Sequence, residues 1–169
     1  MVAVAAALLM LGSHAFAETS PDLDRAEAAV VAAWIKAPLG VRRAFFVARP
    51  PEGFGIYERR PSNRFKPGET LFVYAEPVGF GWKPVGGDRV EFGFEVDFVI
   101  KKRDGTIIGG KDNFARLALQ SHSRNREFML KLSLDVAGVP SGDYVLQYRL
   151  RDIASDKSMS FELPFTIAG

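Results

Sequence analysis

Residues 91–101 read EFGFEVDFVIK, and apolar side chains occupy alternate positions of this stretch. One face of an extended chain would carry Phe92, Phe94, Val96, Phe98 and Ile100, and the opposite face would carry Glu91, Glu95, Asp97 and Lys101. Because successive side chains of a β-strand point to opposite faces, this alternation predicts a strand with one dry face. On this interpretation Glu95 and Asp97 are ordinary residues of the solvent face.

The same alternation recurs in residues 127–136, 143–152 and 158–167. Asp104-Gly105 supplies the positive φ that a tight hairpin needs after the first strand. The remaining predicted strands are Val41–Ala48, Phe54–Glu58, Thr70–Pro77, Thr106–Ile108 and Phe114–Leu119. About nine short strands at hairpin spacing favour an all-β, antiparallel sandwich over a sheet covered by helices.

The turn sequences carry a resemblance to a known class of proteins. They are FKPGE at residues 65–69, which runs into YAEP at 74–77, together with PSGDYVL at 140–146 and DIASDK at 152–157. These motifs resemble those of exported bacterial proteins with an immunoglobulin-like β-sandwich domain, most of them uncharacterised. The resemblance covers roughly residues 65–167. It implies an immunoglobulin-like β-sandwich, and it implies no catalytic residue.

The first seventeen residues predict a secretory signal peptide. An uncharged apolar run, Val2–Leu11, leads to Ala15-Phe16-Ala17, which matches an A-x-A cleavage site. Ten residues of helix cover about 15 Å, too little for a hydrocarbon core of about 30 Å. We therefore expect residues 1–17 to be removed, leaving a periplasmic or secreted protein without a transmembrane span. No Lys or Arg precedes the apolar run, whereas a signal peptide normally begins with a positive segment. An uncleaved N-terminal anchor is the alternative.

Residues 18–40 form the predicted N-terminal helix segment, and residues 41–169 form the predicted β-sandwich domain. Ser20 and Pro21 suit the start of a helix, and Asp22 and Asp24 favour its first turn. The helix is expected from Pro21 to Ala37, before Pro38-Leu39-Gly40. It either packs against the sandwich or serves as a spacer or docking helix for another protein.

Composition excludes several kinds of chemistry. The chain has no cysteine, which excludes disulfides, thiolate metal sites and a cysteine nucleophile. After cleavage His122 is the one remaining histidine, too few for a histidine-rich zinc site, and its spacing indicates no Ser-His-Asp triad. The acids Asp152, Asp156 and Glu162 do not follow a calcium-loop pattern. We expect no metal and no cofactor.

Two segments are candidates for binding. Residues 41–68 contain seven cations and two carboxylates, a local net charge of +5, whereas the whole chain carries +2. Arg59, Arg60 and Arg64 in this segment would either hold anionic groups or stand as solvated charges on edge strands. The glycine-rich loop 78–88 carries Phe80 and Trp82, which either meet a partner or plug the open end of the core.

The sequence thus predicts an exported, non-enzymatic binding or structural accessory protein of the bacterial envelope. Its partner would be an envelope protein or glycan, contacted through loop ends by Phe80, Trp82, Arg59, Arg60 and Arg64. Nucleic acid is not an expected partner for an exported domain of modest charge. The alternative is a hydrolase of cell-wall or sugar polymers, with Glu76 as its acid, because paired carboxylates can come from distant strands.

Overall fold

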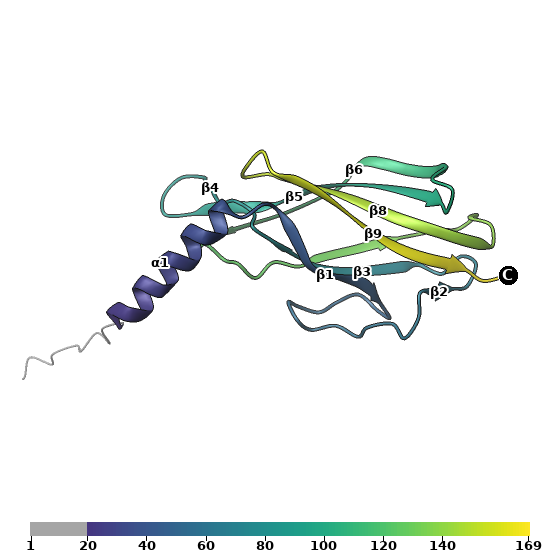
Figure 1. Ribbon diagram of the computed structural model, residues 1–169, viewed down its shortest axis with the longest axis horizontal. Helices are drawn as coiled ribbons and strands as arrows, with labels where there is room; N and C mark the ends of the chain where they lie inside the picture. Colours follow the sequence, from purple (N-terminus) through teal and green to yellow (C-terminus); the bar gives the residue numbers. More distant parts are fainter. Residues whose placement is uncertain (1–19) are drawn as a thin grey trace, which may run out of the picture.

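The computed structural model describes residues 20–169, and the predicted signal peptide lies outside the described residues. One helix precedes a series of strands, and Figure 1 shows that helix extending away from the body of the protein. The elements are α1 (Pro21–Lys36), β1 (Gly40–Val47), β2 (Arg64–Phe65), β3 (Leu71–Val78), β4 (Lys83–Pro84), β5 (Val90–Lys102), β6 (Ile107–Ser121), β7 (Leu130–Leu134), β8 (Gly142–Asp152) and β9 (Ser158–Ile167). No helix among residues 20–169 is long and apolar enough to cross a membrane.

The strands form two sheets of unequal width. The smaller sheet has the antiparallel order β1-β3-β7. The larger sheet has the order β2-β9-β8-β5-β4, and β6 also pairs with β5. The larger sheet is mixed rather than purely antiparallel, because the chain crosses from β1 to the edge of β9 and runs parallel to it as β2. This sheet also curls like half of a barrel.

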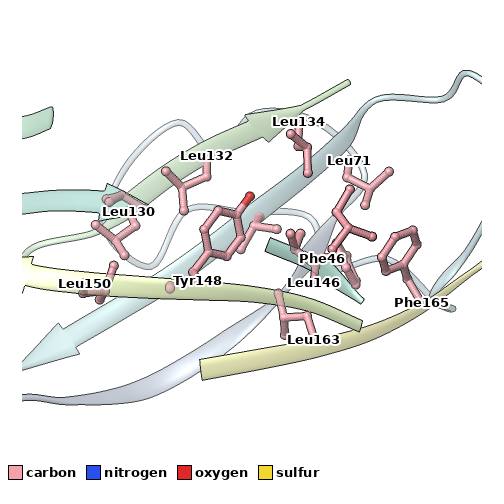
Figure 2. Close-up of a cluster of buried hydrophobic side chains, with 14 of the residues drawn as sticks. Phe46, Leu71, Leu130, Leu132, Leu134, Leu146, Tyr148, Leu150, Leu163 and Phe165 are labelled. Carbon is pink, nitrogen blue, oxygen red and sulfur yellow. The ribbon is translucent and has the colours of Figure 1, made fainter. Parts of the chain in front are cut away.

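The hydrophobic core lies between the two sheets. Figure 2 shows leucines of β7 pointing toward side chains of β8, with Tyr148 among them. The buried leucines of these two strands are Leu130, Leu132, Leu134, Leu146 and Leu150. Alternation in the sequence therefore did identify the inward faces. Burial of such side chains is the main favourable term in folding, at about 1.5–3 kcal/mol each.

The predicted strand Phe54–Glu58 is wrong. Residues 48–60 form a loop that covers the outer face of the smaller sheet. Isolated bridges join Arg59 to Val47 of β1, and Ile56 to Gly53 within the loop. Tyr57 packs there against Phe45 and Tyr74, with ring centroids 4.8 and 4.5 Å away. Of the apolar residues that suggested a strand, Tyr57 is therefore covered by side-chain contact with a sheet rather than by pairing within it, whereas Ile56 is exposed.

The predicted strands Thr106–Ile108 and Phe114–Leu119 are parts of one strand, β6. The pairing of β5 with β6 shifts register between Val96 and Phe98, where β6 carries a bulge. Asn113 lies in this bulge with φ of 50°, and its backbone N–H donates to the Asp97 carboxylate over 2.7 Å. An ordinary alternating ladder would end here, so the sequence suggested two strands where the structure has a bulge.

Asp97 faces away from the core, beside the exposed Arg149 of β8, but it is not an ordinary solvent-face residue as predicted, because the residue is only 7% exposed. The Arg151 guanidinium, on the neighbouring strand β8, donates to the same carboxylate. Burial raises the Asp97 pKa, but the hydrogen bonds from Asn113 and Arg151 outweigh burial and hold the pKa below its ordinary value. The ionised Asp97 therefore fastens the β6 bulge to β5 and β8.

Candidate binding site

Phe80 fills the end of the core and does not face a partner. Its side chain is fully buried, and its ring contacts Phe92, Phe94 and Phe128 at centroid distances of 5.7–6.0 Å. The backbone carbonyl of Phe80 accepts the indole N–H of Trp34 over 2.8 Å. The expectation of a binding contact at Phe80 is therefore corrected: the large apolar ring gains more from closing the core than from exposure to water.

Trp82 remains partly accessible beside this plug. Its ring stacks on Trp34 with centroids 6.0 Å apart, and its indole N–H donates to the Asn125 carbonyl over 2.9 Å. The loop is also held by the N–H of Gly81, which donates to Asp152 over 2.7 Å. The glycines of this loop allow close approach of the backbone to neighbouring segments. A Cβ on Gly79, whose φ is 78°, would lie 2.3 Å from the Pro38 carbonyl oxygen.

The three predicted arginines have different surroundings. Arg60 donates to Glu69 over 2.5 Å and lies over the Phe65 ring at 4.2 Å, so the fold already uses its charge. A hydrogen bond from the Lys66 backbone N–H, together with Arg60, lowers the Glu69 pKa although burial opposes the shift. Arg59 lies over the Phe45 ring at 4.9 Å, and Arg64 is exposed.

The structure does not bring these arginines together with Trp82. Arg60 is anchored to Glu69, just before β3 begins, whereas Trp82 follows the end of β3. An eight-residue strand spans about 25 Å. The prediction that Phe80, Trp82 and the arginines form one contact surface is therefore wrong, because they lie at opposite ends of the smaller sheet.

Glu76, the acid predicted for the alternative hydrolase, is only 2% exposed. It accepts the Tyr74 hydroxyl over 2.9 Å, and an Arg43 nitrogen lies 3.5 Å away. Burial and the neighbouring Glu76 carboxylate raise the pKa of Tyr74 to about 12, against a hydrogen bond from Gly55 that lowers it. This placement closes Glu76 off from a polymer in solvent.

His122 lies on the surface and contacts Asp88 through Nδ1 at 2.8 Å. Both side chains are largely exposed. No group of three or more His, Asp or Glu residues within residues 20–169 is arranged to hold a metal ion.

A groove opens between the free edges of the two sheets, and it was not predicted from the sequence. We call it the seam groove, and its volume is about 360 Å³. Its lining residues are Phe54, Leu117, Ala118, Leu119, Glu127, Phe128, Met129 and Lys131. A polar pocket of about 510 Å³ adjoins it, sharing Phe54 and Glu127 and adding Arg124, Asn125 and Arg126.

The seam groove results from the unequal widths of the sheets. Leu117 and Leu119 of β6 pair with Phe94 and Phe92 of β5, so they point toward the core side of the larger sheet. The smaller sheet ends at β7, within the described chain, and leaves this side partly uncovered. Leu119 is consequently 52% exposed although it points inward. The floor of the groove is thus the part of the larger sheet that the smaller sheet does not cover.

The other wall of the groove is formed by residues 127–129, which lead into β7 but are not paired with a strand. The strand predicted over residues 127–136 pairs with β3 only from Leu130 to Leu134. Continuing that register would place Phe128 opposite Pro77, which has no backbone N–H to donate. Residues 127–129 therefore keep the alternation of a strand without a strand partner among the described residues.

Trp82 borders this groove through two contacts. Its indole N–H bonds to Asn125, which lines the polar pocket, and Phe80 joins Trp82 to Phe128 through ring contacts of 5.8 and 6.0 Å.

No protein-family model matches the chain, and no curated protein matches it. The chemistry of the groove therefore follows from its own residues: apolar walls, two strand-like borders and cations at one end.

Proposed function

We propose that this chain is an exported, non-enzymatic binding or accessory protein of the bacterial envelope that holds a segment of a protein partner in the seam groove. The observation that carries the proposal is the groove itself, an apolar recess that the narrower sheet leaves open. Concave, mostly apolar recesses with a few polar groups are the usual sites of recognition on folded domains. Trp82, at the margin of this groove, is the part of the predicted contact surface that the proposal retains.

We also propose that the fold is immunoglobulin-like. Constant-type immunoglobulin domains place strands A, B and E in one sheet and strands C, F and G in the other. If β1, β3 and β7 are taken as strands A, B and E, and β5, β8 and β9 as strands C, F and G, the two sheets have this arrangement. Tyr144, near the start of β8, donates its hydroxyl to the Pro140 carbonyl over 2.8 Å, which corresponds to the tyrosine corner of such domains.

A protein segment suits the groove better than a glycan does. Sugar rings stack on open aromatic faces, but Trp82 is already stacked on Trp34. The groove instead presents aliphatic side chains such as Leu117, Leu119 and Met129. These groups bind apolar side chains of a protein and gain little from the hydroxyl groups of a sugar.

The proposal is tested by capture from envelope extract with two matched variants. Leu119→Lys places a charge in the groove, and Ile107→Lys places one at the opposite end of the same strand; the two side chains are 52% and 60% exposed. Substitution at such exposed sites changes stability by about 0.5 kcal/mol or less. We expect the wild type and Ile107→Lys to capture the same protein, and Leu119→Lys to lose it.

Two other results would overturn the proposal. Equal capture by all three proteins would place the contact elsewhere on the surface. Retention of a glycan rather than a protein, lost on Trp82→Ala, would favour the glycan alternative. Thermal unfolding of each variant serves as the control, because a variant that is not folded reports nothing about the groove.

A further inference from the structure

The seam groove is bordered by backbone edges as well as by side chains. Three consecutive residues, 117–119, line one side, and three consecutive residues, 127–129, line the other. Consecutive side chains of a strand alternate between faces, so a recess that touches all three lies along the edge of the strand. Among residues 20–169, β6 pairs with β5 on one side and with no strand on the other. Its second edge therefore offers unpaired N–H and C=O groups to the groove.

The bulge limits how much of this edge can accept another strand. Asn113 has a positive φ, and its N–H is already bonded to Asp97. Lys111 and Asp112 beside it are exposed charges, and bulges and charges are the usual protection of an edge strand. Beyond the bulge, Ala115–Ser121 pairs with β5 without interruption, and its one charged residue, Arg116, is paired with Glu91 of β5. This regular part is about 20 Å long.

The charged side chains around the groove favour an occupant of negative charge. Arg124 and Arg126 line the polar pocket and Lys131 lines the apolar one, against a single acid, Glu127. The Nη1 atom of Arg126 is shielded from solvent and has no hydrogen-bond partner in the part of the chain that the structure describes. A guanidinium without an acceptor is best satisfied by a carboxylate, which can accept two of its N–H groups.

From these observations we infer that the partner contributes an extended, acidic segment that adds as a strand to β6 along Ala115–Ser121. Alternate apolar side chains of this segment lie on Leu117 and Leu119, and a carboxylate lies beside Arg126. Strand addition of this kind takes its affinity from backbone hydrogen bonds and its specificity from pockets for alternate side chains. The inference rests on the proposed function and adds the conformation and charge of the bound segment.

The first test uses linear peptides about ten residues long, displayed on phage and selected on the folded protein. We expect enriched sequences to alternate apolar and polar residues, to carry Asp or Glu, and to lack proline in the alternating part. Binding of the enriched peptide should weaken about tenfold or more in Leu119→Lys and Arg126→Gln, and should be unchanged in Ile107→Lys. Enrichment of basic or proline-rich peptides would overturn the inference.

The second test separates strand addition from docking by side chains alone. The enriched peptide is made in two forms, with N-methyl groups on its odd or on its even residues. Only alternate N–H groups of an added strand point to its neighbour, so one form should lose binding and the other should keep it. Hydrogen exchange should show new protection at alternate amides of Ala115–Ser121. Equal binding of both forms, or no new protection, would contradict strand addition.

The outcomes distinguish the inference from the proposed function. A partner captured from extract and lost on Leu119→Lys, together with failure of the N-methyl test, leaves the binding function standing and removes the added strand. Failure of capture and of peptide selection removes both. Sedimentation of the purified protein provides the last arm: dimers that Leu119→Lys dissociates would show that the occupant is a second copy of this chain, which also overturns the inference.

Discussion

Trp34 and Phe80 join the helix to the end of the core: the Trp34 indole N–H donates to the Phe80 carbonyl over 2.8 Å, and the two rings meet edge to face at 5.2 Å. Phe80 belongs to the core, whereas Trp34 comes from α1, which has no buried residue. This pair therefore fixes the only helix of residues 20–169 against the sheets. It also places Trp82, which stacks on Trp34, at the margin of the seam groove.

Phe80→Ala should destabilise the whole domain. It would remove a fully buried ring that contacts Phe92, Phe94 and Phe128, and such truncations cost about 3–5 kcal/mol. The free energy of unfolding in urea measures this loss. Unchanged stability together with weaker partner binding would mean that Phe80 is a contact residue after all.

Lys157→Met should loosen α1 while the sheets stay folded. The Lys157 ammonium donates to the carbonyl oxygens of Ile35, Ala37 and Gly79 over 2.7–2.9 Å, and methionine keeps the length of the side chain without these bonds. We expect a loss of about 1–3 kcal/mol. Hydrogen exchange should become faster in α1, and amides of β8 should stay protected. Unchanged exchange in α1 would show that Trp34 alone holds the helix.

Tyr148→Phe should leave stability unchanged or raise it. The Tyr148 hydroxyl is buried in the core with no hydrogen-bond partner in the described structure, and burial raises its pKa above the ordinary value. Tyr144→Phe is the matched control, because it removes the bond to Pro140 and should cost about 1 kcal/mol. Equal losses in the two variants, measured by thermal unfolding, would indicate a partner for the Tyr148 hydroxyl.

Asp97→Asn should lower stability in a pH-dependent way. The native pKa of Asp97 lies below its ordinary value, so the ionised form stabilises the fold above the unfolded pKa, and this contribution is lost as pH falls through the native pKa. We expect the variant to be about 1–3 kcal/mol less stable at neutral pH. The difference should shrink below about pH 4. A stability difference that does not vary with pH would mean that the charge of the Asp97 carboxylate does not stabilise the fold.

The regular elements were predictable because their periodicity is local. The boundaries of β9 agree with the predicted Ser158–Ile167, and α1 ends one residue before the predicted Ala37. The β6 bulge was not predictable, because it depends on the Asp97 carboxylate reaching Asn113 across the sheet. The two-residue strands β2 and β4 carry too few residues to show any period.

The candidate site was predictable only in part. The aromatic residues Phe80 and Trp82 were found from composition, but their contacts with Trp34 were not, because Trp34 lies almost fifty residues earlier in the chain. The seam groove depends on the width of one sheet relative to the other, which no short stretch of sequence encodes. Leu119 illustrates this, because its alternation marks it as a core residue while the missing cover leaves it 52% exposed.

Occupation of the seam groove by a protein can be measured by photo-crosslinking in intact cells, with a benzophenone amino acid placed at position 119 or, as a control, at position 107. We expect one crosslinked protein partner from position 119 and none from position 107, because Leu119 lines the seam groove and Ile107 lies at the other end of β6. Absence of a crosslink from position 119, or the same products from both positions, would contradict the claim that this groove holds a protein partner.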